Sequence, residues 1–240
     1  IHMQFYIFAN DATGRIVRDA LIDKARQGIE IRVLYDDVGC WSVDDSFFEE
    51  MRCAGIYVRS FLKVRMPKFT SKLNYRNHRK ILVVDGKTGF LGGVNIADRY
   101  YYGNDLGNWH DTHMKIAGEG VISLQTSFLL DRYFILNRKL KKKRKYFPQL
   151  QIKAREGEHS EKHIGTQTLV CGPDSNWASI MQCFFSAITA ARKHIYIVSP
   201  YFTPNESILN AIKIAALGNI DVRIMLPERS DTLITHYGTM

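Results

Sequence analysis

The chain has 240 residues, of which 45% are hydrophobic and 12% aromatic. This composition excludes a largely disordered chain and is sufficient for one large domain or two lobes with a substantial core. The balance of 33 basic against 24 acidic residues gives a formal net charge of +9, which favours an anionic partner such as phospholipid headgroups or nucleic acid.

The first part of the chain has a strand, helix, strand pattern. Residues 5–10 are predicted to form a strand, residues 11 to about 27 a helix, and residues 29–34 a second strand. The helix has apolar residues along one side, and Gly28 follows it as a typical end signal. Alternating strands and helices of this kind indicate an α/β fold with helices covering a mixed sheet.

A β-hairpin is predicted further along the chain. Residues 81–84 are an apolar run typical of a short buried strand, Asp85 and Gly86 form a strong turn signal, and residues 88–91 form the return strand. His78 and Lys80 lie just before the apolar run. Because residues two positions apart on an extended chain point the same way and lie roughly 6.6 Å apart, the two side chains are expected to converge on one anionic group.

The residues around this hairpin follow the pattern His-x-Lys-x4-Asp-x6-Gly-Gly-x-Asn, which suits phosphoryl transfer. A neutral imidazole at His78 can act as a nucleophile, and Lys80 supplies positive charge for phosphate oxygens. Gly93 and the glycine before it allow close approach of the backbone, and Asn95 offers a neutral hydrogen-bond donor. Since fixed cations can replace a metal ion in such chemistry, neither a metal nor a cofactor is expected.

Catalytic histidines usually contact a carboxylate that fixes their tautomer. Asp111 is our candidate, because it begins a segment, residues 111–116, that alternates like a strand. Asp98 and Asp105 are competitors for this role. His113 repeats the His-x-Lys spacing, but no aspartate or Gly-Gly-x-Asn follows, so we interpret this second occurrence as a chance match.

The middle of the chain is predicted to be a helix over residues 120–136, followed by a strongly basic stretch. Seven of the eight residues from 138 to 145 are Lys or Arg. This stretch suits binding to an anionic membrane surface, and a solvated linker is the alternative. A second strand, helix, strand pattern follows, with strands at residues 199–204 and 220–225 and a helix at residues 206–216 capped by Asn205.

Two absences complete the pattern. No run approaches the ~20 apolar residues needed to cross a bilayer. The second strand, helix, strand pattern is not followed by a second His-x-Lys motif, so we expect this pattern to be incomplete.

The four cysteines show no metal-binding or paired spacing and are interpreted as core residues of a protein from a reducing compartment. They are Cys40, Cys53, Cys171 and Cys183.

The hairpin motif resembles the catalytic motif of the phospholipase D superfamily, and residues 73–98 resemble the bacterial cardiolipin synthases. The resemblance implies a phospholipase D-like fold of two pseudo-symmetric repeats. The first would occupy residues 1–140, a connector residues 141–165, and the start of the second residues 166–240. It further implies that His78 attacks phosphorus, that Lys80 binds phosphate oxygens, and that a second histidine protonates the leaving alcohol. By the same resemblance Asp85 is the third motif residue, with an orienting role, and Asp111 the acidic partner.

The implied activity is the joining of two phosphatidylglycerol molecules into cardiolipin with release of glycerol, at the cytoplasmic side of a bacterial membrane. Hydrolysis of lipids by a phospholipase D is the alternative within the same chemistry. A nuclease of this superfamily is a further alternative, although no nucleic acid partner is expected because a partial second repeat would be superfluous in a homodimer. A basic membrane-binding module without catalysis is the remaining hypothesis.

Overall fold

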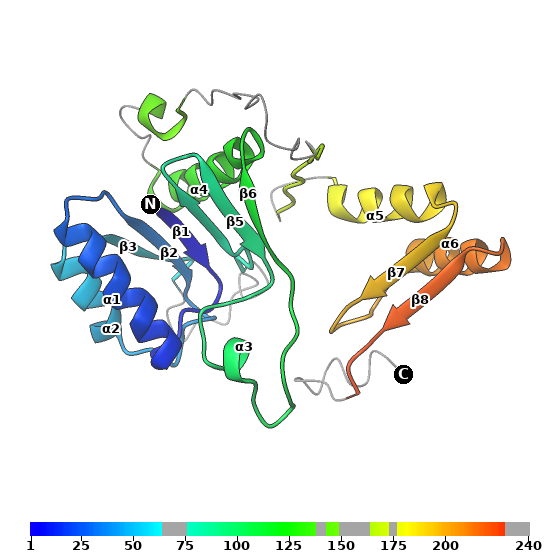
Figure 1. Cartoon of the computed structure of the whole chain (residues 1–240), viewed down its shortest axis with the longest axis horizontal. Helices are drawn as coiled ribbons and strands as arrows, with labels where there is room; N and C mark the ends of the chain where they lie inside the picture. The colour runs from blue at the N-terminus through cyan, green and yellow to red at the C-terminus, as the bar shows by residue number, and fades with distance from the viewer. Residues whose placement is uncertain (64–75, 138–142, 149–163, 173–176, 229–240) are drawn as a thin grey trace, which may run out of the picture. The chain divides into compact units, whose positions relative to one another are not determined.

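In a computed structural model, two compact units are seen, Ile1–Thr168 and Leu169–Met240 (Figure 1). The structure describes residues 1–63, 76–137, 143–148, 164–172 and 177–228. The larger unit is a six-stranded mixed sheet flanked by helices, which confirms the predicted α/β fold class. The division into two repeats with a connector at residues 141–165 stays a prediction, since most of that connector lies outside the described residues.

The sheet of the larger unit has the strand order β3-β2-β1-β4-β5-β6. β1, β2 and β3 are parallel, whereas β4, β5 and β6 are added antiparallel to their neighbours. The strands are β1 (His2–Phe5), β2 (Arg32–Asp36), β3 (Tyr57–Phe61), β4 (Ile81–Val84), β5 (Thr88–Gly92) and β6 (His113–Ala117). The helices are α1 (Ala12–Arg26), α2 (Asp45–Cys53), α3 (Arg99–Tyr102), α4 (Gly120–Leu136) and the short 3-10 helix η2 (Lys143–Tyr146).

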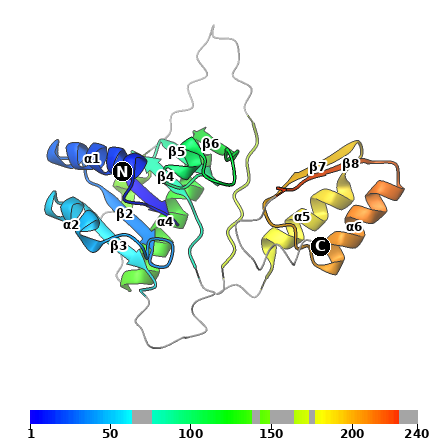
Figure 2. The same cartoon turned by 90° about the horizontal axis from the view of Figure 1, so that it is seen from below.

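Helices cover both faces of this sheet (Figures 1 and 2). Because successive strand residues point to opposite faces, β1 contributes to two different packing layers. Met3 packs in the main core with residues of α1 and α2, while the neighbouring His2 stacks on Phe128 of α4 with ring centroids 4.5 Å apart. A smaller cluster on the α4 side includes Val83 and Leu124. The sheet is thereby fixed between two layers.

The predicted elements of this unit are largely present, with one clear error. α1 is capped by Asp11, whose carboxylate accepts from the Gly14 amide, and the predicted helix at residues 120–136 coincides with α4. The strand predicted at residues 5–10 is wrong, because β1 ends at Phe5. Beyond that point the amides of Ile7 and Ala9 donate to Asn95 and to the backbone of Ile96, instead of joining the β1 ladder.

The smaller unit contains a parallel pair of strands packed on two helices. Its elements are α5 (Ser179–Ala190), β7 (His194–Val198), α6 (Glu206–Leu217) and β8 (Asp221–Met225). The side chain of Asn205 accepts from the Ile208 amide, so the predicted cap of α6 is confirmed. The strand predicted at residues 199–204 is wrong: β7 ends at Val198, and Pro200 and Pro204 have no amide hydrogen for a strand ladder.

The cysteine prediction was correct for one residue only. Cys40 is buried, and its sulfur lies 3.2 Å from the Phe8 amide nitrogen, which donates to it. Cys53 and Cys183 are exposed and Cys171 is half-buried, so these three are not core residues. Cys53 ends α2 on the side away from the buried Phe47, Phe48 and Met51. Within the described ranges, no helix has both the length and the apolar content that crossing a membrane requires.

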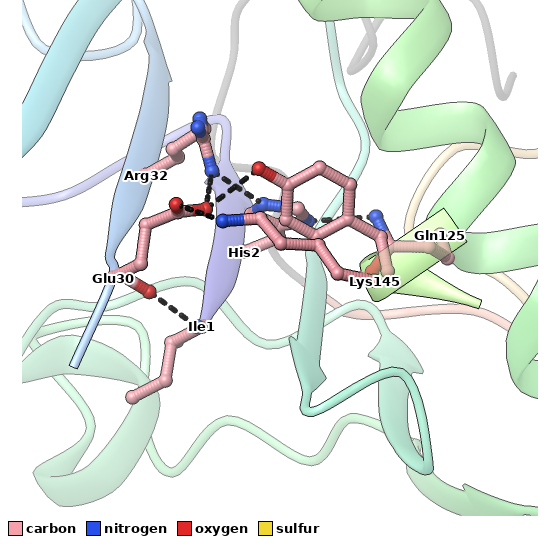
Figure 3. A network of polar contacts seen from close by, with 7 residues as sticks. Ile1, His2, Glu30, Arg32, Gln125 and Lys145 are labelled. Atoms are coloured by element: carbon pink, nitrogen blue, oxygen red, sulfur yellow. Dashed lines mark hydrogen bonds and ion pairs between the residues drawn. The ribbon is translucent and has the colours of Figure 1, made fainter. Parts of the chain in front are cut away.

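A polar network joins the end of the basic stretch to the edge of the larger unit (Figure 3). The carboxylate of Glu30 accepts from the Tyr146 hydroxyl at 2.8 Å and pairs with Lys145 at 2.5 Å and with Arg32. Beneath it, His2 contacts Arg32 and Gln125 through its two ring nitrogens. Lys145 is therefore held by the domain. Residues 138–142 of the basic stretch lie outside the described residues.

His2 is expected to make the protein sensitive to acid. Only 3% of the residue is exposed, and burial lowers its pKa to about 3 from an ordinary value of 6.5. The unfolded chain therefore binds more protons between these values, so the stabilisation is complete above pH 6.5 and is lost as the pH falls towards 3. Each pH unit in this window costs up to about 1.4 kcal/mol. Urea denaturation from pH 7.5 to 4 measures this loss, and an equal slope in His2→Phe would contradict the assignment.

Candidate active site

The topology of the larger unit brings several polar segments to one edge of the sheet. β1 and β2 end at this edge, and β4, being antiparallel to β1, begins there. β5 then ends and β6 begins at the same edge. Tyr6 after β1, His78 and Lys80 before β4, and Asp111 before β6 are therefore neighbours, although the sequence separates them by up to 105 positions.

His78 and Lys80 lie immediately before β4 rather than within it, and their side chains do converge. The Lys80 Nζ atom is 2.8 Å from His78 Nδ1 and 3.3 Å from Nε2, and it also donates to the His78 carbonyl oxygen at 2.8 Å. The Tyr6 ring completes the group, with its centroid 4.6 Å from that of the imidazole and 5.5 Å from Nζ. An imidazole and an ammonium thus share one small space beside an aromatic ring.

The electrostatics of this pair suit the recognition of an anion. Lys80 is only 3% exposed, and burial lowers its pKa to about 8, an effect that Asp111 partly opposes. Burial and then Lys80 lower the pKa of His78, whose surface nevertheless remains open to solvent. In the part of the chain that the structure describes, no carboxylate lies within ion-pair distance of Lys80 Nζ. The site therefore combines a neutral imidazole with a buried cation that has no carboxylate at ion-pair distance among the described residues.

Gly92 and Gly93 are required by the close approach of the segment that leads into β6. A Cβ atom at Gly92 would lie 2.4 Å from the Thr112 carbonyl oxygen, and one at Gly93 would lie 2.0 Å from Asp111 Oδ1. The Gly93 amide also donates to Thr112 at 3.0 Å. Contacts within the protein therefore account for both glycines. The absence of a side chain at Gly93 leaves the space that the Asp111 carboxylate occupies.

Asp111 lies in the site, and its charge acts on Lys80 and His113. Burial lowers the pKa values of both groups and Asp111 partly opposes that effect, whereas the lowered pKa of His78 reflects burial and then Lys80. Its Oδ1 atom accepts from the Thr112 amide at 2.7 Å. His113, which we interpreted as a chance match, pairs with Gly92 in the β5–β6 ladder and has a buried Nδ1 atom without a hydrogen-bond partner among the described residues.

Two of the predicted site residues are placed elsewhere or used internally. Asp85 lies exposed in the β4–β5 turn, at the opposite end of β4 from Lys80. Asn95 is 4% exposed. Its side-chain oxygen Oδ1 accepts from the backbone amide of Ile7, and its side-chain nitrogen Nδ2 donates to the Tyr100 hydroxyl at 2.6 Å. The Asn95 side chain thus connects the residues that follow β1 with the segment that follows β5.

The two competitors of Asp111 also receive clear positions. Asp98 accepts from the amides of Ala12 and Thr13, at 3.2 and 2.7 Å, so its carboxylate holds the first turn of α1. Asp105 lies exposed in the turn between Asn104 and Gly107. Neither carboxylate is in contact with His78 in the described structure.

Sequence reasoning missed the residues that hold the motif in place. Asp36, at the end of β2 and 1% exposed, accepts from the Asn77 amide at 2.9 Å. Asp131 of α4 binds the side chains of Asn77 and Arg79, which flank His78. The polar residues on either side of His78 were a signal that this segment needs partners. Their partners lie 41 to 54 positions away, which the sequence pattern does not reveal.

Alanine at Gly92 is expected to lower the stability of the fold, whereas alanine at Gly93 is expected to change the electrostatics of the site. Gly92→Ala forces Cβ against backbone and should cost about 2 kcal/mol of unfolding free energy. The three atoms nearest to a Cβ at Gly93 all belong to the Asp111 side chain, which can move away, so the main effect of Gly93→Ala should be a further fall in the pKa of Lys80. An NMR titration of the Lys80 side chain measures this fall. Gly165→Ala, with open space around it, is the control; equal titration curves in Gly93→Ala and the native protein would contradict the assignment.

Comparison with solved structures supports the fold. Phosphatidylserine synthase from Haemophilus influenzae Rd KW20 matches with a TM-score of 0.62 at 14% identity, covering 94% of this chain and 55% of that protein. Polyphosphate kinase from Porphyromonas gingivalis matches with a TM-score of 0.53 at 13% identity, covering 94% and 30%. At these identities the likeness concerns the fold alone.

Sequence comparison is more specific. The family model described as "Cardiolipin synthase, PLD-like domain" matches residues 1–119 and 184–239, and the chain therefore belongs to this family. All of the chain aligns with the cardiolipin synthase of Geobacillus kaustophilus at 42% identity, and with the cardiolipin synthase 2 of Bacillus anthracis at 43%. The chain spans about half the length of these relatives, 46% and 45%. The predicted superfamily resemblance is confirmed.

Proposed function

We propose that the protein containing this chain is a cardiolipin synthase that transfers a phosphatidyl group between two phosphatidylglycerol molecules. This proposal rests mainly on the position of the buried Lys80 ammonium, whose Nζ atom lies 2.8 Å from Nδ1 of the His78 imidazole. The names of relatives that align with the whole chain supply the substrate class. An imidazole beside a buried cation suits a phosphodiester, because attack on phosphorus needs a nucleophile and a fixed positive charge near the phosphate oxygens.

In the proposed first step, an imidazole nitrogen of His78 attacks the phosphorus of phosphatidylglycerol. A P–N bond forms, the P–O bond to glycerol breaks, and the leaving glycerol oxygen takes a proton from a histidine that we expect in a second motif elsewhere in the protein. Lys80 turns from the imidazole to the phosphate oxygens. Gly93 and Asn95 stay as proposed contributors to phosphate binding, Gly93 through close backbone approach. We propose that Asp85 acts only by holding the hairpin turn, since it lies far from His78.

In the second step, a glycerol hydroxyl of another phosphatidylglycerol attacks the same phosphorus. The P–N bond breaks, cardiolipin leaves, and the proton of the hydroxyl passes to the histidine that protonated glycerol. Asp111 is proposed to hold Lys80 charged during both steps, because its carboxylate opposes the effect of burial on the pKa of that ammonium. No metal or cofactor has a role in these steps.

The substrates place the reaction at a bacterial membrane, and we propose that the catalytic part faces the cytoplasm. A net charge of +9 suits an anionic lipid surface. The basic stretch is the proposed contact, although Lys145 is already paired with Glu30 and contributes less than a free cation would. Nucleic acid is not a proposed partner.

The test is incubation of the full-length protein with vesicles of labelled phosphatidylglycerol. Labelled cardiolipin together with free glycerol is the expected result. Phosphatidic acid as the main product would instead identify a phospholipase D-type hydrolase, in which water replaces the lipid hydroxyl. Vesicle binding without any product would identify a non-catalytic module and refute the proposal, and cleavage of DNA in the presence of a chelator would identify a nuclease.

A further inference from the structure

The two residues on either side of His78 are both attached to one carboxylate on a different element. Asp131 lies on α4, which packs against the face of the sheet opposite α1 and α2. Its Oδ2 atom accepts from Asn77 Nδ2 at 2.9 Å and from Arg79 Nη1 at 2.6 Å, and its Oδ1 atom lies 2.7 Å from the same Arg79 nitrogen. The side chain of Gln4, from the middle of β1, donates to Oδ2 at 2.6 Å.

The backbone around His78 is held in the same way. The Asn77 amide donates to Asp36 at 2.9 Å, and the Arg79 amide donates to the Asn77 side-chain oxygen at 3.2 Å. The Asn77 side chain therefore connects Asp131 with the backbone just after His78. By contrast, the hydrogen bonds of His78 within the described structure are those with Lys80. Besides these contacts and the Tyr6 ring, the position of the imidazole depends on the backbone that its two neighbours hold.

The burial of this network gives it the rigidity that positioning requires. The side chain of Asp131 is 13% exposed and that of Arg79 is 26% exposed, while Asn77 and Gln4 are 5% and 2% exposed. A carboxylate with a charged donor and two amide donors is fully compensated, so it holds one arrangement. Loss of this acceptor would leave the buried amides of Asn77 and Gln4 without their partner, which favours displacement of the segment.

We propose that Asp131 is a positioning residue that fixes the segment 77–79 on α4 and so holds the His78 imidazole against Lys80. The proposal rests on the proposed function of His78 as nucleophile. The Asp131 carboxylate is bound to Gln4, Asn77 and Arg79, so its effect reaches the reaction through Asn77 and Arg79. Displacement of a reacting group by about 1 Å can cost about 10²-fold in rate, which sets the scale of the expected effect.

The test uses two variants and one control in the full-length protein. Asp131→Ala removes the acceptor, and Asp131→Asn keeps its size and one carbonyl oxygen. Glu30→Ala is the matched control, because Glu30 also binds three partners, Arg32, Lys145 and Tyr146, but precedes β2 at the opposite end of the sheet. The His78 imidazole is followed by nitrogen NMR over a pH titration, with His78→Ala identifying its signal. Turnover of phosphatidylglycerol is measured alongside.

For Asp131→Ala we expect the pKa of His78 to rise towards its ordinary value, because the released imidazole gains solvent and moves away from Lys80. We expect kcat to fall by about 10²-fold with less than about threefold change in KM. Asp131→Asn should change the pKa of His78 and kcat in the same directions but by smaller amounts. Glu30→Ala should change neither the pKa of His78 nor kcat.

The proposal would be overturned by a native His78 titration in Asp131→Asn together with native kcat. If Asp131→Ala does not fold, Asp131→Asn decides alone. Equal effects of Glu30→Ala and Asp131→Ala would also overturn it, since they would reflect lost stability only. The titration is independent of catalysis. A shifted His78 pKa in a protein that makes no cardiolipin would therefore support the positioning role while refuting the proposed activity.

Discussion

Replacing His78 by alanine is expected to lower turnover of phosphatidylglycerol by about 10⁴-fold or more, the scale seen when a covalent nucleophile is removed. The fold should remain intact. His78 is open to solvent and its contacts are with Lys80 and the Tyr6 ring, so the unfolding free energy should change by less than about 1 kcal/mol. Both quantities are measured on the same full-length variant, by product formation and by chemical denaturation.

The control for this variant is His194→Ala, which removes an exposed histidine from β7 in the other unit. It should retain native turnover. Residual activity of His78→Ala within about tenfold of the native protein would remove His78 from the role of nucleophile. A large loss of stability in the same variant would instead show that the imidazole has a structural function.

Replacing Lys80 by methionine is expected to make the protein inactive and more stable at the same time. Turnover should fall by about 10³-fold, because the cation that stabilises the phosphate oxygens is removed. Burial lowers the pKa of Lys80 to about 8 from 10.5, so the folded state disfavours its charged form. Since one pKa unit corresponds to about 1.4 kcal/mol, an uncharged side chain of similar length should stabilise the fold at pH 7 by up to about 3 kcal/mol.

The pH dependence of this gain gives a further check. The unfolded chain binds more protons than the folded protein between pH 8 and 10.5, so the native protein becomes relatively more stable as the pH rises through that window. The advantage of Lys80→Met should therefore shrink above pH 8 and vanish near pH 10.5. Denaturation curves at pH 7, 9 and 10.5 measure it. If Lys80→Met is less stable than the native protein at pH 7, the burial of the Lys80 charge does not destabilise the fold.

The hairpin and three of the helices, α1, α4 and α6, were predictable because their signals are local. The Asp85 and Gly86 turn has positive φ at both positions, 53° and 66°, which is the geometry that this pair of residues favours. The apolar stripe and the end signal at Gly28 predicted α1 within a residue or so. The spacing of His78 and Lys80 was sufficient to predict that their side chains meet, even though the segment lies just outside the strand.

The parts of the site that could not be predicted depend on contacts between distant residues. Asp131 is one carboxylate on a helix, and nothing in its neighbourhood in the sequence relates it to Asn77 or Gln4. The place of Asn95 in the motif predicts a phosphate donor, whereas nothing in the sequence indicates its contacts with Ile7 and Tyr100. The strand error at residues 5–10 has the same origin, since amides that were expected in the β1 ladder find partners after β5.

Trapping the covalent intermediate would show whether His78 forms a bond to phosphorus. The full-length protein is mixed with phosphatidylglycerol labelled at its phosphate, quenched under alkaline conditions that preserve phosphohistidine, digested and sequenced by mass spectrometry. We expect a phosphatidyl or phosphoryl group on the peptide that contains His78, and we expect no such group in His78→Ala. Label on a different residue during turnover, with the His78 peptide unmodified, would contradict it.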